Sequence, residues 1–313
     1  MIDIEWPGRK GQLAVIALAA LLVTAGCAGL GSPDETGNDT VDSEDPDDPG
    51  DDESGDENET DGTDDENSTD ETDSAFSDLD PVEEDVTAAE LLNDSVAALD
   101  TVESYRLQQN ITTVQRSNNQ EITTQNNQTG RIDRAQQRAG IEGVTASQGR
   151  SIETKQYLLN DSLYESNERI AQQYGTQWVR TNLTGSYEQV FEQFDSINQL
   201  ERVFANATGT VEGQTEIDGE EVYAINATVD SDTIVETRQS VNGVERFQLN
   251  LWLSTETALP RQVTEDSALN LSTARGNFTQ QTDSLLAFSY EDVDVTLPEA
   301  AEGAPTAEEV TGQ

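Results

Sequence analysis

The stretch VERFQLNLWLSTETALPRQV, residues 244–263, decides the fold class of this chain. Its apolar residues alternate with polar ones and share one face: Phe247, Leu249, Leu251 and Leu253. Strict alternation is the signature of a β-strand, so Trp252 is expected on the opposite face. The run RQVTEDSAL that follows predicts a second strand, and Asn242-Gly243 in front predicts a turn.

The run EEVYAINATV, residues 220–229, repeats this alternation. Its apolar face holds Tyr223, Ile225, Ala227 and Val229. Asp218-Gly219 just before it predicts a hairpin turn from the strand over 209–217. Further strands are expected over 106–115, 121–136, 151–160, 162–167, 177–182 and 285–298, where Thr, Gln, Val and Tyr are common.

Two stretches have helical rather than strand periodicity. In TAAELLNDSVAALDTVESY, residues 87–105, apolar residues recur at helical spacing, and Thr87 with Glu90 predicts a capping box. In SYEQVFEQFDSINQLERVF, residues 186–204, Ser186 and Gln189 are expected to cap one continuous helix. The apolar stripe of this second helix consists of Tyr187, Val190, Phe191, Phe194, Ile197 and Leu200.

The order of these elements predicts an α+β domain. One helix, a run of strands, a second helix and a second run of strands favour a large antiparallel sheet with helices on one face. The folded domain is expected over residues 82–300, followed by a flexible tail over 301–313.

The N-terminus has the features of a lipoprotein signal peptide over residues 1–26. Arg9 and Lys10 precede an apolar run at 13–23, which is too short to span a bilayer. Thr24-Ala25-Gly26-Cys27 then resembles a lipobox, in which cleavage exposes a cysteine that receives a lipid. The alternative is a plain secretory signal with an incidental cysteine, and the position of the sole cysteine of the chain favours lipidation of Cys27.

An acidic segment separates Cys27 from the predicted domain. Residues 31–80 hold 23 acidic residues and no Lys or Arg, so residues 27–81 are expected to form a disordered linker. The alternative is a calcium-binding tract at residues 45–50, but Pro49 stands at a ligand position of the EF-hand pattern. A solvated spacer is the favoured interpretation.

The charge and the rare residues exclude several classes of function. The net charge of −47 indicates a salt-dwelling microbe, since molar salt screens such repulsion, and it argues against nucleic-acid partners. The chain has one Cys and no His, which removes disulfides, thiolate zinc sites and catalysis by Ser-His or Cys-His pairs. No metal, cofactor or catalytic residue is expected.

Sequons for N-glycosylation are unusually frequent. Twelve of the 19 asparagines begin an Asn-x-Ser/Thr motif, where chance predicts about three or four. The excess is expected of an exported chain that meets glycosylation machinery.

Four stretches make the chain resemble the LolA/LppX-type lipoproteins. They are LYESNERIAQQYGTQWVR, IDGEEVYAINATV, LWLSTETALPRQV and FSYEDVDVTLPEAA. The resemblance covers about residues 83–300 and, together with the acidic composition, implies a haloarchaeal lipoprotein. It also implies an unclosed half-barrel whose helices cover the concave side, where members of the fold bind acyl chains or lipids.

The first function hypothesis is therefore a lipid-anchored protein, exported to the outer side of the cell membrane, that binds a lipid or another hydrophobic ligand. The Gln, Asn and Thr content of the first strands departs from lipid carriers. The alternative is a structural or interaction protein of the envelope with no ligand; an enzyme or a transporter's solute-binding protein ranks lower. The predicted ligand-lining residues are Phe191, Phe194, Tyr223, Ile225, Phe247, Leu249, Leu251 and Leu253.

Overall fold

A computed structural model describes residues 76, 79–82, 86–117, 120–237, 240–273 and 276–311. Over these residues the chain forms eleven strands and six α-helices. The helices are α1 (Ala88–Asp100), α2 (Glu168–Tyr174), α3 (Tyr187–Phe194), α4 (Ser196–Phe204), α5 (Ser231–Thr237) and α6 (Ala307–Thr311), with a short 3-10 helix at Glu299–Ala301. The strands are β1 (Ser104–Ser117), β2 (Gln120–Asp133), β3 (Arg138–Ser147), β4 (Arg150–Leu159), β5 (Ser162–Asn167), β6 (Val179–Asn182), β7 (Ala207–Ile217), β8 (Glu220–Val229), β9 (Val241–Ser254), β10 (Pro260–Thr273) and β11 (Gly276–Ser289).

All eleven strands belong to one antiparallel sheet that does not close into a barrel. Their order is β6-β5-β4-β3-β2-β1-β11-β10-β9-β8-β7, so β6 and β7 stand at opposite ends. Two meanders of neighbouring hairpins meet where β1 pairs with β11, with Leu107 opposite Phe288. The predicted α+β class with a large antiparallel sheet is therefore correct.

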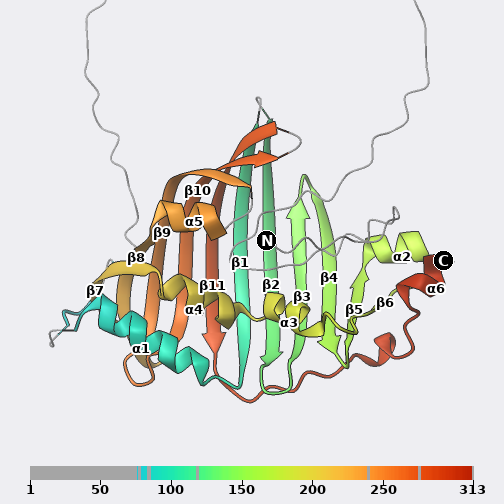
Figure 1. Cartoon of the computed structure of the whole chain (residues 1–313), viewed down its shortest axis with the longest axis horizontal. Coiled ribbons are helices and arrows are strands. Elements are labelled where there is room, and N and C mark those ends of the chain that lie inside the picture. The colour runs from blue at the N-terminus through green and yellow to red at the C-terminus, as the bar shows by residue number, and fades with distance from the viewer. Residues whose placement is uncertain are drawn as a thin grey trace, which may run out of the picture. The chain divides into compact units, whose positions relative to one another are not determined.

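Helices α1, α3 and α4 run across one face of the sheet, which we call the covered face (Figure 1). The main core lies between these helices and the strands, and its fully buried members include Leu99, Ile197, Leu200, Ile225 and Leu251. The capping box of α1 forms as predicted: the Glu90 backbone N–H donates to Thr87 Oγ1 at 3.3 Å, and the Thr87 backbone N–H donates to Glu90 Oε2 at 3.2 Å.

The opposite face, which we call the outer face, carries two smaller apolar clusters. Trp252 packs there with Val222, Ala224 and Phe76, as the strand alternation predicts for Trp252. The segment after β11 also packs on the outer face, where Val295 lies in one cluster with residues of β4: Tyr157 and Leu159.

Several predicted boundaries differ from the structure. The strand expected over 285–298 is β11, which begins at Gly276 and ends at Ser289. The chain after Ser289 leaves the sheet and packs Val295 against Tyr157 and Leu159 on the outer face. Asn242-Gly243 lies inside β9 at a register irregularity, whereas Asp218-Gly219 does form the β7–β8 turn with positive φ at both residues. Strand β3 was not expected, since Gly140 and Gly143 interrupt its apolar pattern.

The C-terminal residues differ from the flexible tail expected over 301–313. Ala301 is fully buried in the outer-face cluster that contains Tyr157 and Val295. Helix α6 begins at Ala307, and Thr306 and Glu309 are hydrogen-bonded to each other at its start. The Arg180 backbone N–H of β6 donates to the Pro305 carbonyl at 2.9 Å. This segment therefore packs beside the edge strand β6, with Ala301 and Ala307 buried and Ala304 half-buried.

Candidate functional site

The predicted ligand-lining residues all lie in the main core on the covered face. Phe191 and Phe194 project from α3, and the others stand on β8 and β9. Register explains their proximity, because Tyr223 pairs with Leu253 and Ile225 with Leu251. Seven of the eight are buried, and Tyr223 is half-buried.

The core around these residues is closely packed. The exposed fraction is 0% for Ile225, Leu251 and Leu253 and no more than 9% for the other buried members. The predicted lining residues of α3 thus contact those of β8 and β9 through apolar side chains alone. Such contacts are non-directional, since they depend on the apolar area removed from water rather than on bond angles.

The helix predicted over residues 186–204 is broken at Asp195 into α3 and α4. Asp195 has an extended backbone with φ −83° and ψ 95°, and its Oδ1 accepts from the Ile197 backbone N–H at 3.1 Å as the N-cap of α4. The apolar stripe survives the break, with Phe191, Phe194 and Ile197 all buried. The predicted Ser186 cap does not form, because the Ser186 hydroxyl donates to the Leu183 carbonyl instead.

The hydroxyl of Tyr105, on β1, lies directly beside this break. It donates to Asp195 Oδ1 at 3.0 Å and accepts from the Ser196 backbone N–H at 2.9 Å. Burial raises the pKa of Tyr105 well above its ordinary value, and the neighbouring Asp195 charge adds to the rise. The neutral hydroxyl therefore holds the start of α4 against the sheet.

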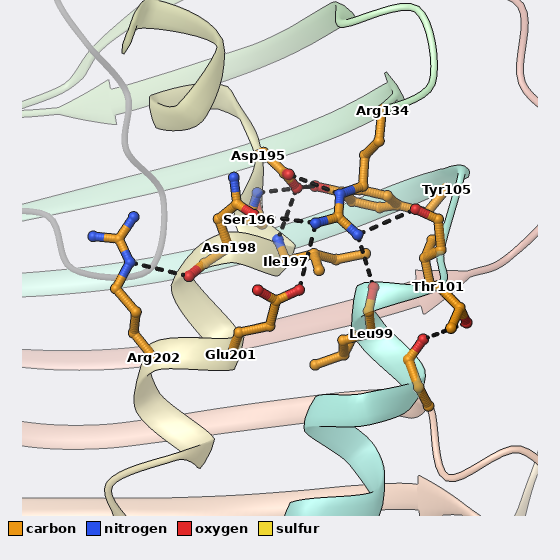
Figure 2. A network of polar contacts seen from close by, with 12 residues as sticks. Leu99, Thr101, Tyr105, Arg134, Asp195, Ser196, Ile197, Asn198, Glu201 and Arg202 are labelled. Atoms are coloured by element: carbon orange, nitrogen blue, oxygen red, sulfur yellow. Dashed lines mark hydrogen bonds and ion pairs between the residues drawn. The ribbon is translucent and has the colours of Figure 1, made fainter. Parts of the chain in front are cut away.

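Arg134, just after β2, connects the same junction to α1 (Figure 2). Its Nε donates to Asp195 Oδ2 at 2.9 Å, and its Nη1 donates to the Leu99 and Val102 carbonyls at 2.7 and 3.1 Å. Leu99 lies in the last turn of α1, where helix carbonyls lack partners within the helix, and Val102 follows just after the helix. Its Nη2 reaches Asn198 Oδ1 at 3.1 Å and Glu201 Oε1 at 3.4 Å, both on α4. One guanidinium thus ties α1 to α4.

Sequence reasoning missed this polar junction. Asp195 carried a usable signal, because Asp is a preferred N-cap residue and stands before a new apolar turn. Its partners carried none, since Tyr105 and Arg134 are 90 and 61 positions away in the chain.

The covered face becomes polar over β2, β3 and β4. A shallow depression of about 10 Å³, room for one water molecule, is lined by Asn126, Gln128, Ile141, Gly143, Thr145, Thr154 and Gln156. Beside it, Gln156 Nε2 donates to Glu165 Oε1 at 3.0 Å. Burial raises the pKa of Glu165, and the Gln156 bond only partly opposes the rise. The Gln- and Thr-rich pattern of the first strands thus marks a polar part of the same face that holds the apolar core.

Cys27, the predicted lipidation site, lies outside the described residues. Among the described residues, no helix is long and apolar enough to cross a membrane. Within those same ranges no three Asp, Glu, Cys or His side chains gather in a way that could hold a metal ion.

No protein-family model matches the chain, and no curated protein matches it. Among solved structures, it is similar to LprF from Mycobacterium bovis, with 16% identity, 68% of this chain and 97% of that chain covered, and a TM-score of 0.43. It is also similar to the lipoprotein LppX from Mycobacterium tuberculosis, with 10% identity, 67% and 98% covered, and a TM-score of 0.37. An outer membrane lipoprotein-sorting protein domain from Vibrio parahaemolyticus matches at 9% identity, with 67% and 94% covered and a TM-score of 0.22. At these identities and TM-scores the similarities carry no functional argument.

Proposed function

We propose that this chain is an exported, non-catalytic lipoprotein of the cell envelope, anchored on the outer side of the membrane through Cys27. In this proposal it holds a lipid or another hydrophobic molecule between the sheet and α3–α4. The anchor is supported by the order of basic pair, short apolar run and Thr-Ala-Gly-Cys. Residues 27–81 would then act as a linker between the lipid and the folded domain.

The observation that carries the ligand site is the apolar packing of α3 between two polar attachments. The bonds of Asp195 fix the junction of α3 with α4, and at the start of α3 the Tyr187 hydroxyl donates to the Gln137 carbonyl at 2.6 Å. Between these ends, Phe191 and Phe194 contact the sheet only through apolar surface. An acyl chain offers the same kind of surface, so it can replace these side-chain contacts when α3 moves outward and the Tyr187 bond breaks. The junction with α4 then stays in place.

A second candidate function is an envelope structural or interaction protein with the same fold and no ligand. The close packing favours it, because the predicted lining residues fill the space between helix and sheet themselves. The depression on β2–β4 adds room only for one water molecule.

Extraction of the purified protein separates the two candidates. The Cys27→Ser variant, collected from the culture medium in molar salt, has no anchor, so any lipid released by organic solvent is a bound ligand. Native mass spectrometry should show this variant with an added mass that solvent extraction removes. A variant that carries no such mass, while the wild type carries only the covalent anchor, favours the ligand-free candidate.

Fractionation of cells tests the anchor by itself. The wild type should sediment with membranes and be released by detergent, whereas Cys27→Ser should appear in the medium. Retention of Cys27→Ser on membranes would contradict lipidation at Cys27, whatever the extraction shows.

A further inference from the structure

Nine of the twelve sequons begin within the described residues, and none of their asparagines is buried. Six are exposed: Asn93, Asn127, Asn160, Asn182, Asn206 and Asn277. The other three, Asn110, Asn226 and Asn270, are half-buried. The sugar-bearing atom of a sequon is Asn Nδ2, so accessibility of this side chain is the first requirement of the folded product.

The sequon asparagines that lie in strands all face away from α1, α3 and α4. On β1, Leu107 faces the core, so Asn110 faces outward, and its cross-strand partner Asn127 on β2 does the same. The same alternation places the sequon asparagines of β6, β8, β10 and β11 on the outer face: Asn182, Asn226, Asn270 and Asn277. In contrast, Asn126 and Asn167 are strand residues of the covered face, and neither begins a sequon.

Ser95 provides an independent observation. It is fully buried under α1, and its Oγ has no hydrogen-bond partner among the described residues. A buried, unpaired hydroxyl destabilises a fold, and alanine would fill this helical position without that cost. Ser95 is also the third residue of the sequon Asn93-Asp94-Ser95, and Asn93 is exposed on the solvent side of the same helix. A sequon requires Ser or Thr at its third position, and this requirement is met before α1 folds. It explains why position 95 carries a hydroxyl.

The sequon asparagines differ in whether a hydrogen bond occupies their Nδ2 atom. Asn182 Oδ1 accepts from the Thr184 backbone N–H at 2.9 Å and from Thr184 Oγ1 at 2.6 Å, which is an Asx turn built from the sequon itself. These bonds use the oxygen and leave Nδ2 to solvent. Asn160 is exposed in the β4–β5 turn with φ +53°. By contrast, Asn270 Nδ2 donates to Glu245 at 3.0 Å.

From these observations we propose that the outer face of the sheet and the solvent side of α1 carry N-linked oligosaccharides. The donor is an oligosaccharide activated as a lipid pyrophosphate. A bond forms between Asn Nδ2 and the anomeric carbon of the sugar, the lipid pyrophosphate leaves with the bonding electrons, and the amide loses one proton. Asn93, Asn127, Asn160 and Asn182 are modified. Asn110 remains unmodified, because cross-strand Cβ atoms lie only about 5 Å apart and Asn127 is the more exposed of the pair.

The arrangement has a consequence for contacts with other molecules. Bulky sugars on the outer face prevent that face from docking on a partner, whereas the covered face has no sequon asparagine among the described strand residues. Ligands and protein partners therefore approach the covered face, on the side of α1, α3 and α4. This assignment does not depend on whether a lipid is bound.

Mass spectrometry of peptides from the full chain, purified from its own host in molar salt, tests the proposal. The peptides that contain Asn93, Asn127, Asn160 and Asn182 should carry a common oligosaccharide mass, and the peptide with Asn110 should lack it. Recovery of these four asparagines without added mass would overturn the proposal.

A pair of variants tests the role of Ser95. Ser95→Ala should remove the oligosaccharide from Asn93 and raise Tm compared with Asn93→Gln, which loses the same oligosaccharide but keeps the buried hydroxyl. If Ser95→Ala retains sugar on Asn93, or if its Tm is equal to or below that of Asn93→Gln, the explanation of Ser95 is wrong.

Discussion

Arg134 and Asp195 form an ion pair with 2.9 Å between Nε and Oδ2, although 61 positions separate them in the chain. The side chain of Asp195 is only 1% exposed, and that of Arg134 is 16% exposed. A carboxylate buried to this degree requires a partner, because desolvation of an uncompensated charge is costly. The pair therefore fixes where α4 begins relative to α1 and the sheet.

Removal of Arg134 should destabilise the domain strongly. Arg134→Met keeps much of the side-chain volume but leaves the Asp195 charge buried without its partner, so we expect a loss of about 3–5 kcal/mol in the free energy of unfolding. Chemical denaturation in molar salt measures it. Arg246→Met is the matched control, because the Arg246–Asp266 pair is 52% and 43% exposed and should contribute less than about 1 kcal/mol. Equal losses would contradict the role of the buried pair.

Truncation of Phe194 should leave a cavity in the main core. Its ring is 6% exposed, and we expect Phe194→Ala to lower the free energy of unfolding by about 3–5 kcal/mol. Glu192→Ala, an exposed change on the same helix, should have an effect within about 0.5 kcal/mol. If a ligand occupies this region, added lipid extract should raise Tm more for the wild type than for Phe194→Ala. A small loss without ligand would show that Phe194 is not a core residue.

Glu165 should make stability depend on pH. Its folded-state pKa is raised above 4.5 by burial, so its favourable contribution is complete below pH 4.5 and is lost as pH rises through the folded-state pKa. Glu165→Gln keeps an acceptor for Gln156 without the charge. This variant should be more stable than wild type at pH 7, and the difference should disappear near pH 4.

Glu90→Gln is the control with the opposite sign. Bonds from Thr87 lower the pKa of Glu90, so its contribution is present above pH 4.5 and is lost as pH falls through the lowered pKa. Glu90→Gln should therefore be slightly less stable than wild type at pH 7. If Glu165→Gln is less stable than wild type at pH 7, the argument that burial raises the pKa of Glu165 is wrong.

Salt should be required for folding. Residues 81–313 hold 38 acidic and 14 basic residues, a net charge of −24 in this part of the chain alone. Screening over about 3 Å in 1 M salt removes most of the repulsion between these charges. Circular dichroism from molar to millimolar salt should show a cooperative loss of sheet. A complete sheet signal at millimolar salt would be incompatible with this expectation.

The sequence predicted features that depend on neighbouring residues. Alternation placed Phe247, Leu249 and Leu251 on one strand face and Trp252 on the other, and the structure agrees. The capping box of Thr87 and Glu90 also formed as predicted, because both of its bonds lie within one helical turn. The predicted lining residues came together because they share faces of adjacent strands and one helix. Their contact with a ligand remains a prediction, as does the lipidation of Cys27.

By itself, the sequence determined the class of the fold and the apolar side of each main element, because periodicity of 2 or 3.6 residues is a local property of the chain. Only the tertiary structure decided that β1 pairs with β11, that β9 runs through Asn242-Gly243, and that the predicted helix breaks at Asp195. Each of these depends on a partner far away in the chain. The break is stable because Tyr105 and Arg134 both bind the buried carboxylate of Asp195. No local sequence pattern predicts these contacts.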